Sequence, residues 1–379
     1  MQQKELISEY GEYLELQKQE GKTIIAFLAH DNIPEELIHA AGFIPLRMIF
    51  AGNERFMNVS HNYLPPSTCC FAQTCIGLFS LKESPYNFLE LVDYIVVSNH
   101  CISDMCASEI ISKYSFIPRI NFYVSYTQNE NGLKYYKLEL EEFRKQLEEI
   151  KGSPIPDKKI IESVKKYNSL KKQLTRISQL NIQGSLKIKM YQKALLYGPT
   201  INPELERFIR EQKQKEYDLK NHTKDIILTG CSVFIGDDIL EIIEGNGGNI
   251  ILFDSWIGTK YFKQILSQEK IQSIEDPLDL FVERYKKNTS SDHAVPDFHE
   301  EYLEDLKEKI RTQSKKREKD IGVINHIMKF CDHISLFQAF TKDELKNENI
   351  PILNLERDYS RANRGQLKTR IEAFLEMME

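Results

Sequence analysis

Long apolar runs, glycine and proline are all scarce in this sequence. No run of about 18 or more uncharged apolar residues occurs, and a helix that spans a membrane needs such a run. Residues 1–22 are polar and rich in Glu, Gln and Lys instead of carrying an apolar signal core. With only 17 Gly and 13 Pro among 379 residues, the chain is also unlike disordered, collagen-like or low-complexity proteins. We therefore expect a compact cytoplasmic protein that does not bind membranes.

Basic stripes and basic arms are also missing. The chain has 50 Lys and Arg against 56 Asp and Glu, which gives a formal net charge of −6. Proteins that bind nucleic acids neutralise phosphates with clustered basic side chains, so we expect no nucleic-acid partner. The length suggests two or three domains, each large enough to fold without a structural metal. A metal in this protein is therefore expected to serve its function.

Short apolar runs rich in Ile and Val alternate with longer amphipathic stretches, a pattern typical of α/β proteins with parallel sheets. The alternation occurs in both halves of the chain. Predicted strands cover residues 23–28, 44–49, 93–97 and 117–124 in the first half, and 225–228, 249–253, 321–328 and 350–354 in the second. Residues 34–41 and 366–378 are predicted to be helical.

A long, charged and helical stretch separates the two halves. It covers residues 133–180 and is interrupted by Gly152-Ser-Pro-Ile-Pro156, a cluster of residues that end helices. We expect two doubly wound α/β domains with parallel sheets, at residues 1–150 and 221–379, joined by a helical connector at residues 151–220. No residue-level repeat is strong enough to indicate duplication.

Cysteine is the most informative residue type. An odd number of cysteines in a reducing compartment argues against a disulfide framework and for thiolate chemistry. The seven are Cys69, Cys70, Cys75, Cys101, Cys106, Cys231 and Cys331. Cys101, Cys231 and Cys331 each follow a predicted strand, and open α/β sheets bind ligands outside the carboxyl ends of their strands. Thiols from both halves are therefore expected to meet in a cleft between the domains.

Helix N-termini give a second reason to group these thiols. Cys69 and Cys75 follow Pro65-Pro-Ser-Thr68, which is typical of a helix start, and Cys106 lies about one turn after Cys101. A helix N-terminus favours the thiolate form. Ordinary buried cysteines, a zinc site and an iron–sulfur site are all compatible with these positions. The spacings are unlike the tight knuckles of zinc sites, and scattered ligands suit the cluster of an iron–sulfur enzyme.

Three histidines are candidates for acid–base catalysis near this cleft. His30 lies at the end of a predicted strand, and His100 and His333 lie close to two of the cysteines. An ATP site is not indicated, because Gly21-Lys-Thr23 resembles only the tail of a P-loop and precedes a strand instead of following it.

Four stretches of the sequence match a known family. They are Pro34-Glu-Glu-Leu-Ile-His-Ala-Ala-Gly-Phe-Ile-Pro45, Leu64-Pro-Pro-Ser-Thr-Cys-Cys-Phe-Ala-Gln-Thr-Cys75, Gly322-Val-Ile324 followed by Cys331, and Gly365-Gln-Leu-Lys-Thr-Arg-Ile-Glu-Ala-Phe-Leu-Glu376. On these stretches the chain resembles, nearly from end to end, the 2-hydroxyacyl-CoA dehydratase and benzoyl-CoA reductase family. The resemblance implies two α/β domains with an iron–sulfur cluster between them. Three cysteines of each subunit usually bind one cubane in that family, and they correspond to Cys69, Cys101 and Cys331.

The sequence departs from the dehydratase pattern by three further cysteines, Cys75, Cys106 and Cys231. Six ligands suggest a double-cubane [8Fe-9S] cluster, as in the double-cubane branch of the family, with one [4Fe-4S] cluster as the alternative. Cys70 adjoins Cys69 and is the other candidate ligand at that place. The register of the family favours Cys69.

The resemblance also implies a function and partners. We expect an ATP-dependent, low-potential reductase component that forms a homodimer and reduces a small molecule. Its electrons would come from a separate ATP-hydrolysing iron–sulfur activator. One alternative is a subunit of an (R)-2-hydroxyacyl-CoA dehydratase, a lyase with a single [4Fe-4S] cluster and a hetero-partner. Another is a cluster-carrying electron relay without a substrate of its own.

Overall fold

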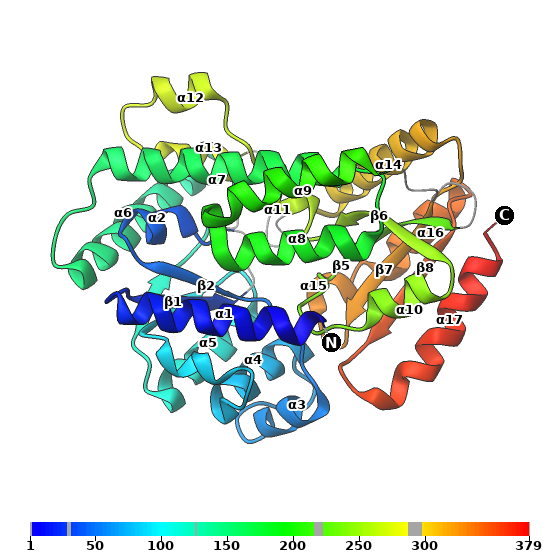
Figure 1. Cartoon of the computed structure of the whole chain (residues 1–379), viewed down its shortest axis with the longest axis horizontal. Helices are drawn as coiled ribbons and strands as arrows, with labels where there is room; N and C mark the ends of the chain where they lie inside the picture. Colours follow the sequence, from blue (N-terminus) through cyan, green and yellow to red (C-terminus); the bar gives the residue numbers. More distant parts are fainter. Residues whose placement is uncertain (1, 29–31, 126, 216–222, 287–297, 379) are drawn as a thin grey trace.

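Two four-stranded parallel sheets form the framework of the protein (Figure 1). The computed structural model describes residues 2–28, 32–125, 127–215, 223–286 and 298–378. The strand order is β2-β1-β3-β4 in the first sheet and β6-β5-β7-β8 in the second. The strands are β1 (Ile24–Leu28), β2 (Ile44–Met48), β3 (Tyr94–Ser98), β4 (Arg119–Phe122), β5 (Lys224–Gly230), β6 (Gly248–Asp254), β7 (Gly322–Met328) and β8 (Ile352–Arg357).

The strands form where the apolar runs predicted them. β1 and β7 are buried along their whole length, as expected for inner strands of a parallel sheet that is covered on both faces. Each half of the chain places its first strand next to its second and its third, so the two sheets have the same order. The predicted fold class, two α/β units with parallel sheets joined by helices, is confirmed.

Helices make the crossovers between parallel strands and cover both sheets. None in the described part of the chain is long and apolar enough to cross a bilayer. The α-helices are α1 (Gln2–Gln19), α2 (Glu35–Ala40), α3 (Glu54–Ser60), α4 (Cys70–Leu81), α5 (Ile102–Ser115), α6 (Glu130–Lys151), α7 (Asp157–Ser178), α8 (Gly184–Tyr197), α9 (Asn202–Gln214), α10 (Ile239–Gly245), α11 (Thr259–Phe262), α12 (Gln268–Ser273), α13 (Asp279–Lys286), α14 (Phe298–Arg317), α15 (Asp332–Ser335), α16 (Gln338–Asn347) and α17 (Arg364–Glu376). Short 3-10 helices lie at η1 (Asn87–Leu91), η2 (Gly198–Ile201) and η4 (Arg361–Asn363).

The helical connector also begins as the sequence predicts. α6 ends at Gly152, whose φ of 73° favours glycine, and α7 starts directly after Pro156. α7 then packs against α2 of the first half, while α8 packs against β6 of the second. The connector therefore contacts both sheets. The boundaries at residues 150 and 220 stay predictions.

After β6 the chain returns to the first sheet before it completes the second. Leu266, Phe281 and Tyr285 are buried in the same core as Phe27 of β1 and Phe122 of β4. Figure 1 shows α12 and α13 lying beside α6 and α7, away from the second sheet. α14 then covers the second sheet. The first unit thus uses residues from both halves of the chain.

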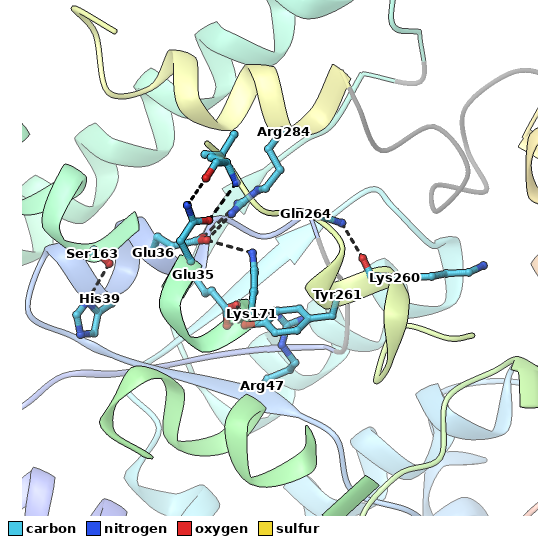
Figure 2. Close-up of polar contacts among 12 residues, drawn as sticks. Glu35, Glu36, His39, Arg47, Ser163, Lys171, Lys260, Tyr261, Gln264 and Arg284 are labelled. Atoms are coloured by element: carbon cyan, nitrogen blue, oxygen red, sulfur yellow. Dashed lines mark hydrogen bonds and ion pairs between the residues drawn. The ribbon is translucent and has the colours of Figure 1, made fainter. Parts of the chain in front are cut away.

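A buried ionic network fastens the returning segment to the first sheet (Figure 2). Glu36 on α2 accepts hydrogen bonds from Arg284 on α13 and, at 3.4 Å, from Lys171 on α7. The adjacent Glu35 accepts a hydrogen bond of 2.6 Å from the Tyr261 hydroxyl on α11. Burial would raise the pKa of Glu36, but the charges of Arg284 and Lys171 outweigh it and lower the pKa to about 2.

Replacing Glu36 with Gln is expected to lower the free energy of unfolding at pH 7 by about 3 kcal/mol, because the buried charges of Lys171 and Arg284 lose their carboxylate. The folded pKa lies below the unfolded value of 4.5, so this stabilisation is present above about pH 4.5 and is lost as the pH falls towards 2. Urea denaturation of parent and variant at pH 7 and pH 3 measures both effects. The difference between the proteins should shrink at the lower pH.

The control is Glu130→Gln, which removes an ion pair of 2.8 Å with Lys134 from a side chain that is 84% exposed. Exposed pairs of this kind contribute less than about 1 kcal/mol. If Glu36→Gln were no more destabilising at pH 7 than Glu130→Gln, the buried network would not hold the returning segment in place.

Candidate functional site

Three of the cysteines are the N-cap residues of helices. Cys69 caps α4, Cys101 caps α5 and Cys331 caps α15. Cys101 and Cys331 follow β3 and β7, and Cys231 comes directly after β5. The prediction that three thiols lie just beyond strand ends is therefore confirmed, and the same positions place helix N-termini beside them.

The thiols from the two halves of the chain meet. Cys69 and Cys331 lie within hydrogen-bonding reach of each other, and so do Cys331 and Cys231. Cys101 interacts electrostatically with Cys331 and Cys69. Cys75, six residues after Cys69 on α4, interacts electrostatically with Cys69. These five cysteines form the thiol site.

Backbone N–H groups are directed at the sulfurs of the thiol site. The amide of Met328 donates to Cys231 Sγ at 3.4 Å. The amide of Ala72, in the first turn of α4, donates to the sulfur of Cys69. Two amides in the first turn of α5 do the same for Cys101. Such donors stabilise a thiolate, and those of α4 and α5 are the unpaired N–H groups of a helix N-terminus.

Burial opposes the effect of these amides on the thiol pKa values. The pKa of Cys69 is well above its ordinary value because its thiol is hydrogen-bonded to Cys331 and is buried. Burial likewise raises the pKa of Cys101, although the amides of its helix lower it. The helix amides therefore favour the thiolate form, as expected, but burial outweighs them, and the thiols of the protein alone stay protonated. A cation that binds here must displace thiol protons.

The other two cysteines lie differently. Cys70 is within electrostatic range of Cys69, but also of Arg357 and Asp358. Cys69, by contrast, is hydrogen-bonded to Cys331, so the structure places Cys69 rather than Cys70 next to the thiols of the second half. Cys106 is half-buried on α5, five residues after the N-cap, which turns it about 140° around the helix axis from Cys101.

A buried carboxyl group beside the thiols was not identified from the sequence. Asp104, in the first turn of α5, is 8% exposed and lies within electrostatic range of Cys69, Cys75 and Cys101. Burial raises the pKa of Asp104 to about 7, although the nearby His100 lowers it. Its only signal in the sequence is its position, one turn after Cys101.

The three candidate histidines have different surroundings. His100 is buried and its ring contacts the side chains of Asn32 and, at 3.2 Å, Ser98. His333 is half-buried on α15, two residues after Cys331. His30 lies outside the described residues. A catalytic role for any of the three stays a prediction.

A large cavity lies between the two halves of the chain and adjoins the thiol site. Its volume is about 1430 Å³, and its walls come from the segment after β2, from α8, from the start of α10 and from the segment after β8. Arg357 and Tyr359 belong to this wall, and both lie within electrostatic range of Cys70. The cavity therefore reaches close to the cysteines from one side.

A hydrogen-bonded chain connects the cavity wall with the thiol site. Arg357 forms an ion pair with Asp237, also in the wall, and donates from Nε to His326 Nε2 at 3.0 Å. Since Arg357 can only donate, the His326 proton resides on Nδ1 and is donated to the Cys231 carbonyl at 2.9 Å. Burial, together with Arg357, lowers the pKa of His326 to about 3, which keeps the ring neutral.

The residues of the thiol site fit an iron–sulfur cluster better than a single metal ion. Within the described ranges, no three His, Cys, Asp or Glu side chains are already arranged around one point as a metal site. Soft thiolates from several helix N-termini, surrounded by amide donors, are the ligand type of iron–sulfur clusters. The donor set is therefore suited to a cofactor wider than one ion.

The chain is similar to known proteins along nearly its whole length. The family model of the 2-hydroxyglutaryl-CoA dehydratase D-component matches residues 32–378. The chain is 23% identical to the (R)-phenyllactyl-CoA dehydratase beta subunit of Clostridium sporogenes, over 91% of this chain and 89% of that protein. It is 22% identical to the protein YjiM of Escherichia coli (strain K12), over 91% and 89%.

A third relative is a benzoyl-CoA reductase subunit of Thauera aromatica, which is 22% identical over 92% of this chain and 88% of that protein. Dehydratase and reductase subunits are thus found at similar identity. Because the family model covers nearly all of the chain, the chain belongs to the 2-hydroxyglutaryl-CoA dehydratase D-component family, whose members are dehydratase or reductase subunits acting on acyl-CoA substrates.

Proposed function

We propose that this chain is a low-potential iron–sulfur reductase component of its family. The observation that carries the proposal is the meeting of cysteines from both sheets, each presented by a helix N-terminus or a strand end. Cys69, Cys101 and Cys331 would hold a cubane, and Cys75, Cys106 and Cys231 would extend it to a double-cubane cluster. When bound, such a cluster supplies one-electron chemistry at low potential.

The protein's own groups would prepare the site for a negatively charged cofactor. The amides of Met328, Ala72 and the first turn of α5 would donate to ligand sulfurs. Asp104 would hold a proton beside the thiols near neutral pH, because burial disfavours its charge. Burial of Cys69, Cys75 and Cys231 would also limit the access of water to their sulfurs.

The cavity next to the thiol site would bind the substrate. Its volume of about 1430 Å³ exceeds the size of ordinary ligand pockets and can accept a long molecule. Lys189 and Arg361 line it, and neither forms an ion pair within the described part of the chain. Both are suited to the phosphate groups of a CoA thioester.

A separate ATP-hydrolysing activator would deliver the electrons. Two exposed apolar side chains, Ile102 and Phe330, each adjoin a cysteine of the thiol site, and Leu336 follows on the segment after Cys331. Their exposed fractions are 57%, 44% and 75%. Exposed apolar groups beside a redox centre favour a partner that docks there. We expect the complete reductase component to be a homodimer.

A dehydratase subunit with one [4Fe-4S] cluster is the second candidate. It is favoured by the position of Cys106, which lies on another side of α5 from Cys101 and is half-buried. The similarity to the (R)-phenyllactyl-CoA dehydratase beta subunit points the same way. Such a subunit would need a different partner subunit to complete it.

Iron and acid-labile sulfide per chain separate the two candidates. Protein purified without oxygen is expected to contain about eight irons per chain if six cysteines hold a double cubane. About four irons would favour the dehydratase subunit. Protein without iron after anaerobic handling would contradict both. Electron paramagnetic resonance of the reduced protein checks that the iron belongs to a cluster.

Single cysteine substitutions test the assignment of ligands. Cys75→Ser, Cys106→Ser and Cys231→Ser should each reduce the iron content clearly below that of the parent, because a serine oxygen is a poor ligand for cluster iron. Cys70→Ser is the matched control and should keep the parent's iron content, since Cys69 is the residue that meets the other thiols. Full iron in all three variants would rule out the double cubane.

A further inference from the structure

The hydroxyl of Tyr359 is a buried polar group without a partner. The residue follows β8 and is 8% exposed. Its hydroxyl oxygen is fully buried and makes no hydrogen bond to any described residue. The large majority of buried side-chain polar atoms in proteins are hydrogen-bonded, and each exception requires an explanation.

The hydroxyl of Tyr359 is closed off from the cavity that the residue helps to line. Tyr359 is part of the wall, but its hydroxyl oxygen is buried, so other atoms of the residue meet the cavity. The hydroxyl is within electrostatic range of Cys70 and Cys69. Its donor is therefore close to sulfur and closed off from the cavity.

Neighbouring polar groups are already engaged and leave the hydroxyl unpaired. The Asp237 carboxylate is bound by Arg357 and by the backbone amide of Ile239 at 3.0 Å. The Asp358 carboxylate is bound by Lys329 at 2.7 Å and by a backbone amide. The carboxylates of Asp237 and Asp358 thus already accept hydrogen bonds from charged side chains and backbone amides, and neither accepts one from the Tyr359 hydroxyl.

A glycine, Gly52, leaves the space that the Tyr359 ring occupies. A Cβ atom at Gly52 would lie 2.8 Å from Tyr359 Cδ2 and 2.0 Å from Thr74 Oγ1. Only glycine at this position allows the ring to pack between the segment after β2 and α4, the helix that Cys69 caps. The packing therefore fixes the hydroxyl instead of letting it turn to solvent.

We propose that the Tyr359 hydroxyl donates a hydrogen bond to a sulfur atom of the iron–sulfur group held by the thiol site, and so stabilises its reduced form. The inference rests on the proposed function, because it requires the cluster. Reduction adds negative charge to the sulfurs, and a hydrogen bond to a charged acceptor is stronger than one to a neutral acceptor. Hydrogen bonds to the sulfurs are among the determinants of cluster potential. Burial keeps the pKa of Tyr359 well above its ordinary value, so the donor proton is retained.

The test is the midpoint potential of the cluster in Tyr359→Phe, measured by a redox titration that is followed by electron paramagnetic resonance. Removal of one donor should make the cluster harder to reduce by about tenfold in the equilibrium constant, which is about 59 mV for one electron. The iron content should equal that of the parent. Tyr359 contacts the cluster directly in this account, and a merely structural role would not move the potential while leaving iron intact.

Tyr10→Phe is the matched control. Tyr10 on α1 is 0% exposed, its hydroxyl also lacks a partner among the described residues, and only tyrosines influence its charge electrostatically. Both substitutions should leave the melting temperature of the iron-free protein unchanged, since neither removes a hydrogen bond within the chain. Only Tyr359→Phe should shift the potential.

The outcomes separate this inference from the proposed function. A parent without iron would contradict the proposed function and the inference with it. A parent with a cluster, together with an unchanged potential in Tyr359→Phe, would overturn the inference alone. Equal shifts in Tyr359→Phe and Tyr10→Phe would also overturn it, because the effect would then not depend on closeness to the sulfurs.

Discussion

The junction between the two parallel sheets is the constraint on which the rest of the structure depends. Residues just beyond β2 and just beyond β5 form a parallel bridge, at Phe50 and Ile235. Its hydrogen bonds, from the Ile235 amide to the Ile49 carbonyl and from the Ala51 amide to the Ile235 carbonyl, are both 2.8 Å long. This bridge ties the carboxyl end of one sheet to that of the other. Loops that leave neighbouring strands at this junction then bring their thiols together.

Electrostatics at the junction is a balance between burial and backbone donors. Burial favours neutral thiols and a neutral Asp104, whereas amides at helix N-termini favour negative charge on sulfur. Arg357 contributes a fixed positive charge, but Asp237 pairs with it and limits the effect. A cofactor with cationic iron and anionic sulfur would replace the thiol protons and accept hydrogen bonds from the same amides. The amide donors stay in place whatever the charge of the cofactor. The arrangement would therefore suit a cluster whose charge changes on reduction.

The features that the sequence predicted correctly are local ones. The strands, the helix break at Gly152 and the placement of Cys101 and Cys331 after strands depend on runs of a few residues, and such runs determine local structure wherever they occur. Parallel sheets bind ligands at the carboxyl ends of their strands, and from this rule we predicted that the cysteines of both halves meet. The register of the family favoured Cys69 over Cys70 as a ligand, and the structure adds that Cys69 lies next to Cys331 in space.

Features that join distant segments were not predictable from a single sequence. The return of α12 and α13 to the first sheet depends on Arg284 meeting Glu36, which lies 248 residues earlier, and no local pattern encodes that pairing. Tyr359 carries no signal either, since one aromatic residue after a strand is ordinarily part of a core. Its meaning follows from a combination of facts that only the structure contains: a buried hydroxyl, engaged neighbours and two thiols in range. Tyr359 thus belongs to the cavity wall and at the same time interacts electrostatically with two of the cysteines.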